Sequence, residues 1–167
     1  MGLSISNTLT LRQYYHNNRT LVTKANRSEA GIGKLSFADA SALRNAISKL
    51  GDYKFKDATD DDKVEKLKAF CDTYNYTLSS SAKYAKNDTA VRNNVKRIKE
   101  LTSQHESELS NCGFSIDKTT GQLSISDSAA KNIGPEKFEK LLGSDSKYMK
   151  DLYSYAKKLT KHIDITL

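Results

Sequence analysis

Residues 60–112 read DDDKVEKLKAFCDTYNYTLSSSAKYAKNDTAVRNNVKRIKELTSQHESELSNC. Apolar residues recur through this stretch at steps of three and four, which is the spacing of one face of an α-helix. The acidic run at residues 60–62 suits the positive end of a helix, and Asp88 suits the N-cap of the next one. The stretch therefore predicts a mainly α fold built on two long helices, which the short link Lys86-Asn87 joins as an antiparallel helical hairpin or bundle.

The apolar stripes of these two helices are narrow, close to the seam of a coiled coil. The second stripe continues through His105 to Cys112, so this helix is expected to reach residue 112. His105 is expected to be partly buried and hydrogen-bonded. The seam residues are expected to pack within the chain or against partner helices, and they are Leu67, Tyr74, Leu78, Val91, Val95, Ile98 and Leu101.

Beyond Cys112 the apolar period changes to that of a β-strand. Two alternating segments follow, residues 114–117 and 122–125, and Gly121 between them can adopt the positive φ that a hairpin corner needs. The pattern predicts a β-hairpin near 114–125 that docks on the helices, since a two-stranded hairpin is not stable alone. Its defining residues are Phe114, Ile116, Asp117, Gly121, Leu123 and Ile125.

The N-terminal part of the chain has a weaker pattern. Residues 1–35 are expected to form a weakly helical arm, with a helix near 7–25, that becomes ordered on assembly. From residue 36 the chain is expected to form a single helical domain over 36–167. Its first helix is predicted from Ser36 to Leu50, and residues 51–59 are predicted to be a polar linker.

The C-terminal part predicts short helices. One is expected to begin at Ser126 or Asp127 and to end at Gly134, and Pro135 suits the first turn of another that ends at Leu142. The last helix is predicted from about Ser146 to Ile163.

The composition narrows the class of protein. The chain has 167 residues, 27 Lys and Arg against 20 Asp and Glu, and a net charge of +7, which leaves nucleic acid as a second candidate partner. No apolar run is long enough to span a bilayer, so no membrane insertion is expected. The N-terminus lacks the basic start and apolar run of a cleaved signal peptide. Cys71 and Cys112 fall at apolar positions of the helical stripes and are expected to be reduced and buried rather than joined in a disulfide.

The residues that usually carry chemistry form no motif. His16, His105 and His162 are scattered, and none lies in a Cys cluster or four residues from another His. The run Gly31-Ile32-Gly33-Lys34 lacks the spacing of a phosphate-binding loop, and no serine lies in a nucleophile elbow. We therefore expect a protein that is not an enzyme, with no catalytic residue, metal or cofactor.

The segment Leu109 to Ile125 resembles a signature of bacterial flagellar filament-capping proteins, the hook-associated proteins that plug the filament tip. The matching positions are Leu109, Gly113, Ile116, Asp117, Gly121, Leu123, Ser124 and Ile125. Phe70-Cys71-Asp72-Thr73-Tyr74-Asn75 resembles a Phe-Val-x-Ala-Tyr-Asn phrase on the preceding long helix of that family, and Phe138 to Leu142 resembles a segment further along.

This resemblance covers about residues 60–145 and implies the helical stem domain of those proteins without their β-rich outer domains. It implies a non-enzymatic structural or protein-interaction module, which associates with itself or with a filament-type partner. It also implies a bacterial protein, either cytoplasmic or exported without a cleaved signal peptide to the flagellum or the cell exterior. The alternative from the residues alone is a basic helical protein that binds nucleic acid or regulates other proteins.

Overall fold

A computed structural model describes residues 8–163 of the chain. These residues form a mainly helical fold with one two-stranded antiparallel sheet, which confirms the predicted class. The elements in chain order are α1 (Leu9–Tyr14), η1 (Arg19–Val22), α2 (Lys24–Glu29), α3 (Ile32–Gly51), η2 (Phe55–Asp57), α4 (Asp60–Tyr84), α5 (Thr89–Gln104), α6 (Glu106–Asn111), β1 (Phe114–Ile116), β2 (Leu123–Ile125), α7 (Asp127–Asn132), α8 (Pro135–Leu142) and α9 (Lys147–His162).

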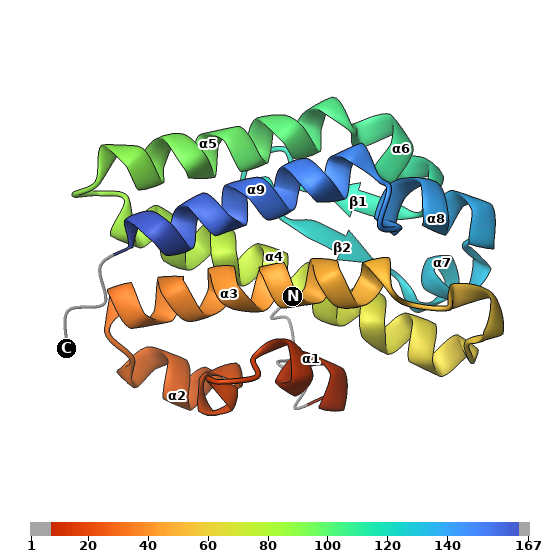
Figure 1. Ribbon diagram of the computed structural model, residues 1–167, viewed down its shortest axis with the longest axis horizontal. Helices are drawn as coiled ribbons and strands as arrows, with labels where there is room; N and C mark the ends of the chain where they lie inside the picture. Colours follow the sequence, from red (N-terminus) through yellow and green to blue (C-terminus); the bar gives the residue numbers. More distant parts are fainter. Residues whose placement is uncertain (1–7, 164–167) are drawn as a thin grey trace.

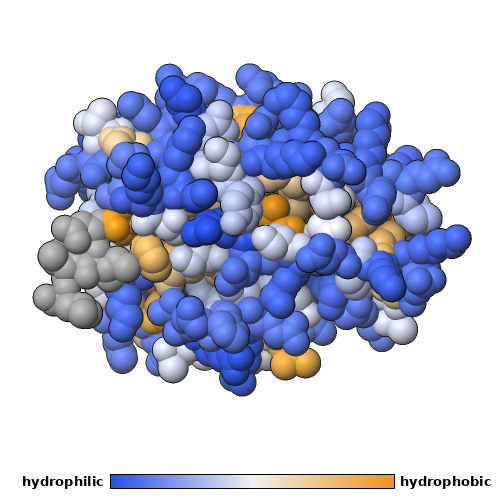
Figure 2. All heavy atoms as spheres, viewed as in Figure 1, coloured by the Kyte–Doolittle hydropathy of each residue, from blue (hydrophilic) through white to orange (hydrophobic). Residues whose placement is uncertain are grey.

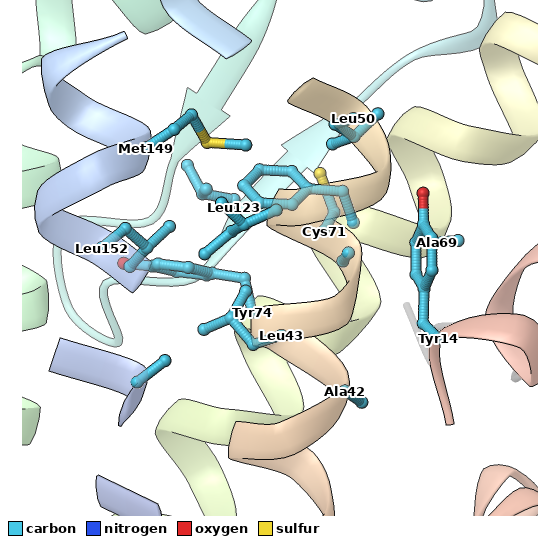
Figure 3. Close-up of a cluster of buried hydrophobic side chains, with 14 of the residues drawn as sticks. Tyr14, Ala42, Leu43, Leu50, Ala69, Cys71, Tyr74, Leu123, Met149 and Leu152 are labelled. Atoms are coloured by element: carbon cyan, nitrogen blue, oxygen red, sulfur yellow. The ribbon is translucent and has the colours of Figure 1, made fainter. Parts of the chain in front are cut away.

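Four long helices build the core. In Figure 1, α9 lies between α3 and α5, with α4 and the β-hairpin behind them. The predicted pair of α4 and α5 is present, but α4 packs most extensively on α3 and α5 on α9. Figure 3 shows Leu43 of α3, Tyr74 of α4, Leu123 of β2 and Leu152 of α9 gathered in one buried cluster. The core is therefore made between the two halves of the chain.

The predicted helix starts at residues 60 and 89 are confirmed by their caps. The Thr59 hydroxyl accepts from the Asp62 N–H, and the acidic residues 60–62 occupy the first turn of α4. The Asp88 carboxylate accepts from the Val91 N–H at 2.8 Å. Each cap gives a partner to an N–H group that a helix start leaves unpaired.

The single helix predicted near 7–25 is wrong. Its first position, residue 7, lies outside the described residues, and the rest forms α1, η1 and α2. The helical conformation is interrupted at Asn18, whose backbone is not helical, and at Thr23, whose hydroxyl caps the start of α2. Leu11, Tyr14 and Val22 of these elements are nevertheless buried in the core, whereas Leu9 is exposed.

The helix predicted from Ser36 begins four residues earlier, at Ile32, with Gly31 as its N-cap. Ser36 is not a cap, because its side chain is buried and its hydroxyl forms a 2.8 Å hydrogen bond with that of Ser81 on α4. The predicted linker over 51–59 is also more ordered than expected. It contains η2, whose Phe55 stacks on Phe138 of α8 with ring centroids 4.1 Å apart.

The helix predicted to continue to Cys112 is interrupted at His105. Here the backbone leaves the helical region, and the imidazole Nδ1 lies 3.0 Å from the Leu101 carbonyl oxygen, as expected for a partly buried, hydrogen-bonded histidine. Glu106 and Glu108 then lie in the first turn of α6, where negative charge favours a new helix start. Leu109 and Cys112 of the predicted apolar stripe are buried, so the stripe continues beyond this interruption of the helix.

Candidate functional site

The seven predicted seam residues lie inside the fold. They are at most 7% exposed, so their alternative role as an exposed seam for a partner helix is excluded in this structure. The physical reason is that α3 and α9 cover the sides of α4 and α5 that a two-helix hairpin would leave open. Leu67, Tyr74, Leu78, Val91, Val95, Ile98 and Leu101 are therefore core residues.

The predicted hairpin is confirmed. Phe114 pairs with Ile125 and Ile116 with Leu123, and their side chains share the face that packs on the helices. Gly121 has a φ of +78°, the left-handed conformation that glycine adopts at least cost. The Asp117 carboxylate accepts from the N–H groups of Thr119 and Thr120 at 2.8 Å, and these bonds lower its pKa.

The hairpin is tied to α4 by a bracket, which we define as the two hydrogen bonds between the Asn75 side chain and the Leu123 backbone. The Asn75 Nδ2 donates to the Leu123 carbonyl oxygen and its Oδ1 accepts from the Leu123 N–H, both at 2.8 Å. Alternate residues of an antiparallel pair direct these groups away from the other strand. The amide of Asn75 thus acts as a third strand at the open edge of β2.

A chain of hydroxyl groups links three helices beside this bracket. The Tyr74 hydroxyl donates to Thr102 of α5 at 2.8 Å, and Thr102 is 3.2 Å from the Tyr148 hydroxyl of α9. Burial raises the pKa of both tyrosines. The hydroxyls therefore stay protonated and serve as hydrogen-bond partners in the core.

Asp39 of α3 is a charged residue whose side chain is fully buried. Arg27 of α2 makes a two-pronged ion pair with it, with distances of 2.7 and 2.8 Å. The hydroxyls of Tyr15 and Ser80 also donate to the Asp39 carboxylate, the latter at 2.6 Å. The Arg27 guanidinium lies 3.8 Å from the centroid of the Tyr76 ring. This Asp39 cluster fastens the N-terminal segment to α3 and α4, and the sequence analysis missed all of its members.

Asp72 of α4 is the buried carboxyl that lacks such compensation. It is 5% exposed, and burial raises its pKa to about 6 although Lys68 acts in the opposite direction. The unfolded carboxyl has its ordinary value of 3.8. The native state thus binds this proton more tightly, and the stability contribution of Asp72 falls as pH rises through the window between the two values.

We predict that Asp72→Asn raises the free energy of unfolding by about 2 kcal/mol near pH 7, because the amide removes the cost of a buried charge. Near pH 4 the variant and the native protein are expected to differ by less than about 0.5 kcal/mol. Urea unfolding at a series of pH values measures both. A variant that is less stable than the native protein at pH 7, with a smaller loss near pH 4, would mean that the carboxylate makes a favourable contact.

One cleft of the surface places a cysteine beside charged residues. A cavity of about 400 Å³ beside α6 and α8 is lined by Glu108, Cys112 and Lys137, among others. The Cys112 thiol donates to the Lys137 carbonyl oxygen at 3.6 Å, and burial raises its pKa. Cys71 and Cys112 are both free and buried, as predicted. A thiol held in this way is a packing group rather than a nucleophile.

Within residues 8–163, no His, Cys, Asp and Glu side chains gather in a group that could hold a metal ion. In the same part of the chain, no helix has both the length and the apolar character needed to cross a bilayer.

No family model, curated protein or solved structure matches the chain. The interpretation of its function therefore depends on what its residues contact. The two segments that resemble filament-capping proteins are in contact in the fold. Asn75 belongs to one and Leu123 to the other, and the Asn75 bracket joins them. The Asn75 bracket was missed by the sequence analysis, although the Tyr74-Asn75 pair itself was noted.

Proposed function

We propose that the chain is a non-enzymatic structural module that works by protein interaction, including association with further copies of itself. The observation that carries this proposal is the Asn75 bracket. It gives an architectural task to Asn75 and Leu123, which lie in the two segments that resemble the stem domain of flagellar caps. This arrangement supports a function in which the folded scaffold itself, rather than a catalytic site, is what the protein contributes.

The N-terminal segment supplies the surface for association. Among the described residues, the large apolar side chains that are exposed are Leu9, at 69%, and Ile32, at 38%. Leu9 lies at the start of α1, in the segment that precedes the four long helices, and Ile32 lies at the start of α3, the first of those helices. Apolar side chains that a fold leaves exposed gain free energy when a partner covers them.

We predict that the average mass measured by light scattering rises with protein concentration, and that Leu9→Glu suppresses this rise. The substitution removes exposed apolar surface and adds a charge where two copies would meet, without touching the core. Gln13→Glu is the matched control, since it adds the same charge at another exposed position of α1. It is expected to associate like the native protein.

A mass that stays at that of the monomer over the whole concentration range would contradict self-association. Equal suppression by Leu9→Glu and Gln13→Glu would show that net charge, and not the apolar side chain, controls association.

A further inference from the structure

The exposed charge of the molecule is unevenly distributed. The N-terminal half of α5 carries Arg92 and Lys96, with Arg97 directly after it, and the C-terminal half of α9 carries Lys157, Lys158 and Lys161, all with exposed side chains. We call these six residues the basic ridge. Because α5 and α9 are antiparallel neighbours, these two halves lie side by side at one end of the fold (Figure 1).

Few carboxylates offset this charge. Glu100 lies near Lys96 at 3.7 Å, with both side chains more than half exposed, and residues 152–162 contain no Asp or Glu. At the other end of the fold the lysines are interleaved with acidic residues, as in the ion pairs Lys66–Asp62 and Lys150–Asp145. The ridge is therefore a region of positive potential, which attracts anions.

The chemistry of the ridge favours a polyanion over a protein. The other exposed side chains on α5 are polar, among them Asn93, Ser103 and Gln104, and Figure 2 shows mostly hydrophilic atoms over these helices. Stable protein interfaces need a dehydrated apolar or aromatic centre, which this surface lacks. Interfaces with nucleic acid are more polar and strongly positive.

The same surface distinguishes between forms of nucleic acid. Proteins that hold single strands stack bases on exposed aromatic rings. Tyr155 lies on α9 among the ridge lysines, and it is only partly exposed, with the Lys158 ammonium 5.2 Å from its ring centroid. Cationic side chains along two adjacent helices instead suit the regular phosphates of a duplex.

We infer that the basic ridge binds the phosphate backbone of double-stranded nucleic acid, largely independently of sequence. This interaction is separate from the self-association proposed above, because Leu9 and Ile32 are not part of the ridge.

The test is fluorescence anisotropy with a labelled DNA duplex over a range of salt concentrations. The native protein is expected to bind with a slope of log K against log salt of about −4 to −5, as for some five phosphate contacts. The triple variant Lys96→Gln, Arg97→Gln, Lys161→Gln is expected to bind at least about 10-fold more weakly and to reduce the slope by about 3. Circular dichroism and urea unfolding check that the variant is folded.

The matched control is Lys54→Gln, Lys56→Gln, Lys140→Gln, which removes the same charge from exposed lysines at the opposite end. It is expected to bind the duplex within about 2-fold of the native protein, and duplexes of unrelated sequence are expected to bind alike. Equal weakening by both triple variants would overturn the assignment to the ridge. Equal or tighter binding of poly-glutamate or of single-stranded DNA would overturn the assignment to a duplex.

Discussion

Asp39→Ala is expected to lower the free energy of unfolding by about 3 to 5 kcal/mol. The substitution leaves the Arg27 guanidinium, whose side chain is 10% exposed, without its partner. The hydroxyls of Tyr15 and Ser80 lose their acceptor at the same time. Burial raises the pKa of the Tyr15 hydroxyl, so this group stays protonated and does not replace the lost negative charge. Urea unfolding followed by circular dichroism measures the change.

Two comparisons separate this effect from the loss of any ion pair. The exposed pair Lys147–Asp151 is expected to contribute little, so Asp151→Ala should cost less than about 0.5 kcal/mol. The double variant Arg27→Met, Asp39→Leu removes both charges and is expected to cost less than Asp39→Ala alone. If Asp39→Ala were no more harmful than Asp151→Ala, the Asp39 cluster would not fasten the N-terminal segment.

Asn75→Ala is expected to lower the free energy of unfolding by about 3 kcal/mol, since the buried N–H and carbonyl of Leu123 both lose their partner. The change is measured by urea unfolding. Asn93→Ala, at an exposed position of α5, is the matched control and is expected to change stability by less than about 0.5 kcal/mol. A similar result for the two variants would mean that the hairpin is held by apolar packing alone.

Local patterns predicted most of the secondary structure. The three- and four-residue steps in 60–112 found α4 and α5, and the alternation around Gly121 found the hairpin with its correct buried face. The cap at Asp88, a helix start at Ser126 or Asp127 and the start at Pro135 were also predicted, because a helix start depends on the few residues around it.

Contacts between distant residues could not be predicted in this way. Asn75 and Leu123 are 48 positions apart, and Ser80 and Asp39 are 41 apart, so no periodic signal connects them. The sequence left open whether the seam of α4 and α5 packs within the chain or against partner helices. The helices that cover it, α3 and α9, come from opposite ends of the chain. The breaks at Asn18 and His105 were missed since short apolar stripes continue across them.

The structural role of the Asn75 bracket is tested most directly by hydrogen exchange at the amide of Leu123. This N–H is directed away from β1, so only the Asn75 side chain protects it. We predict that it exchanges as slowly as the core amides of α4 and that Asn75→Ala makes its exchange fast, while the amide of Ile98 on α5 remains slower. Fast exchange of the Leu123 amide in the native protein would contradict the bracket and the architectural role given to the residues that form it.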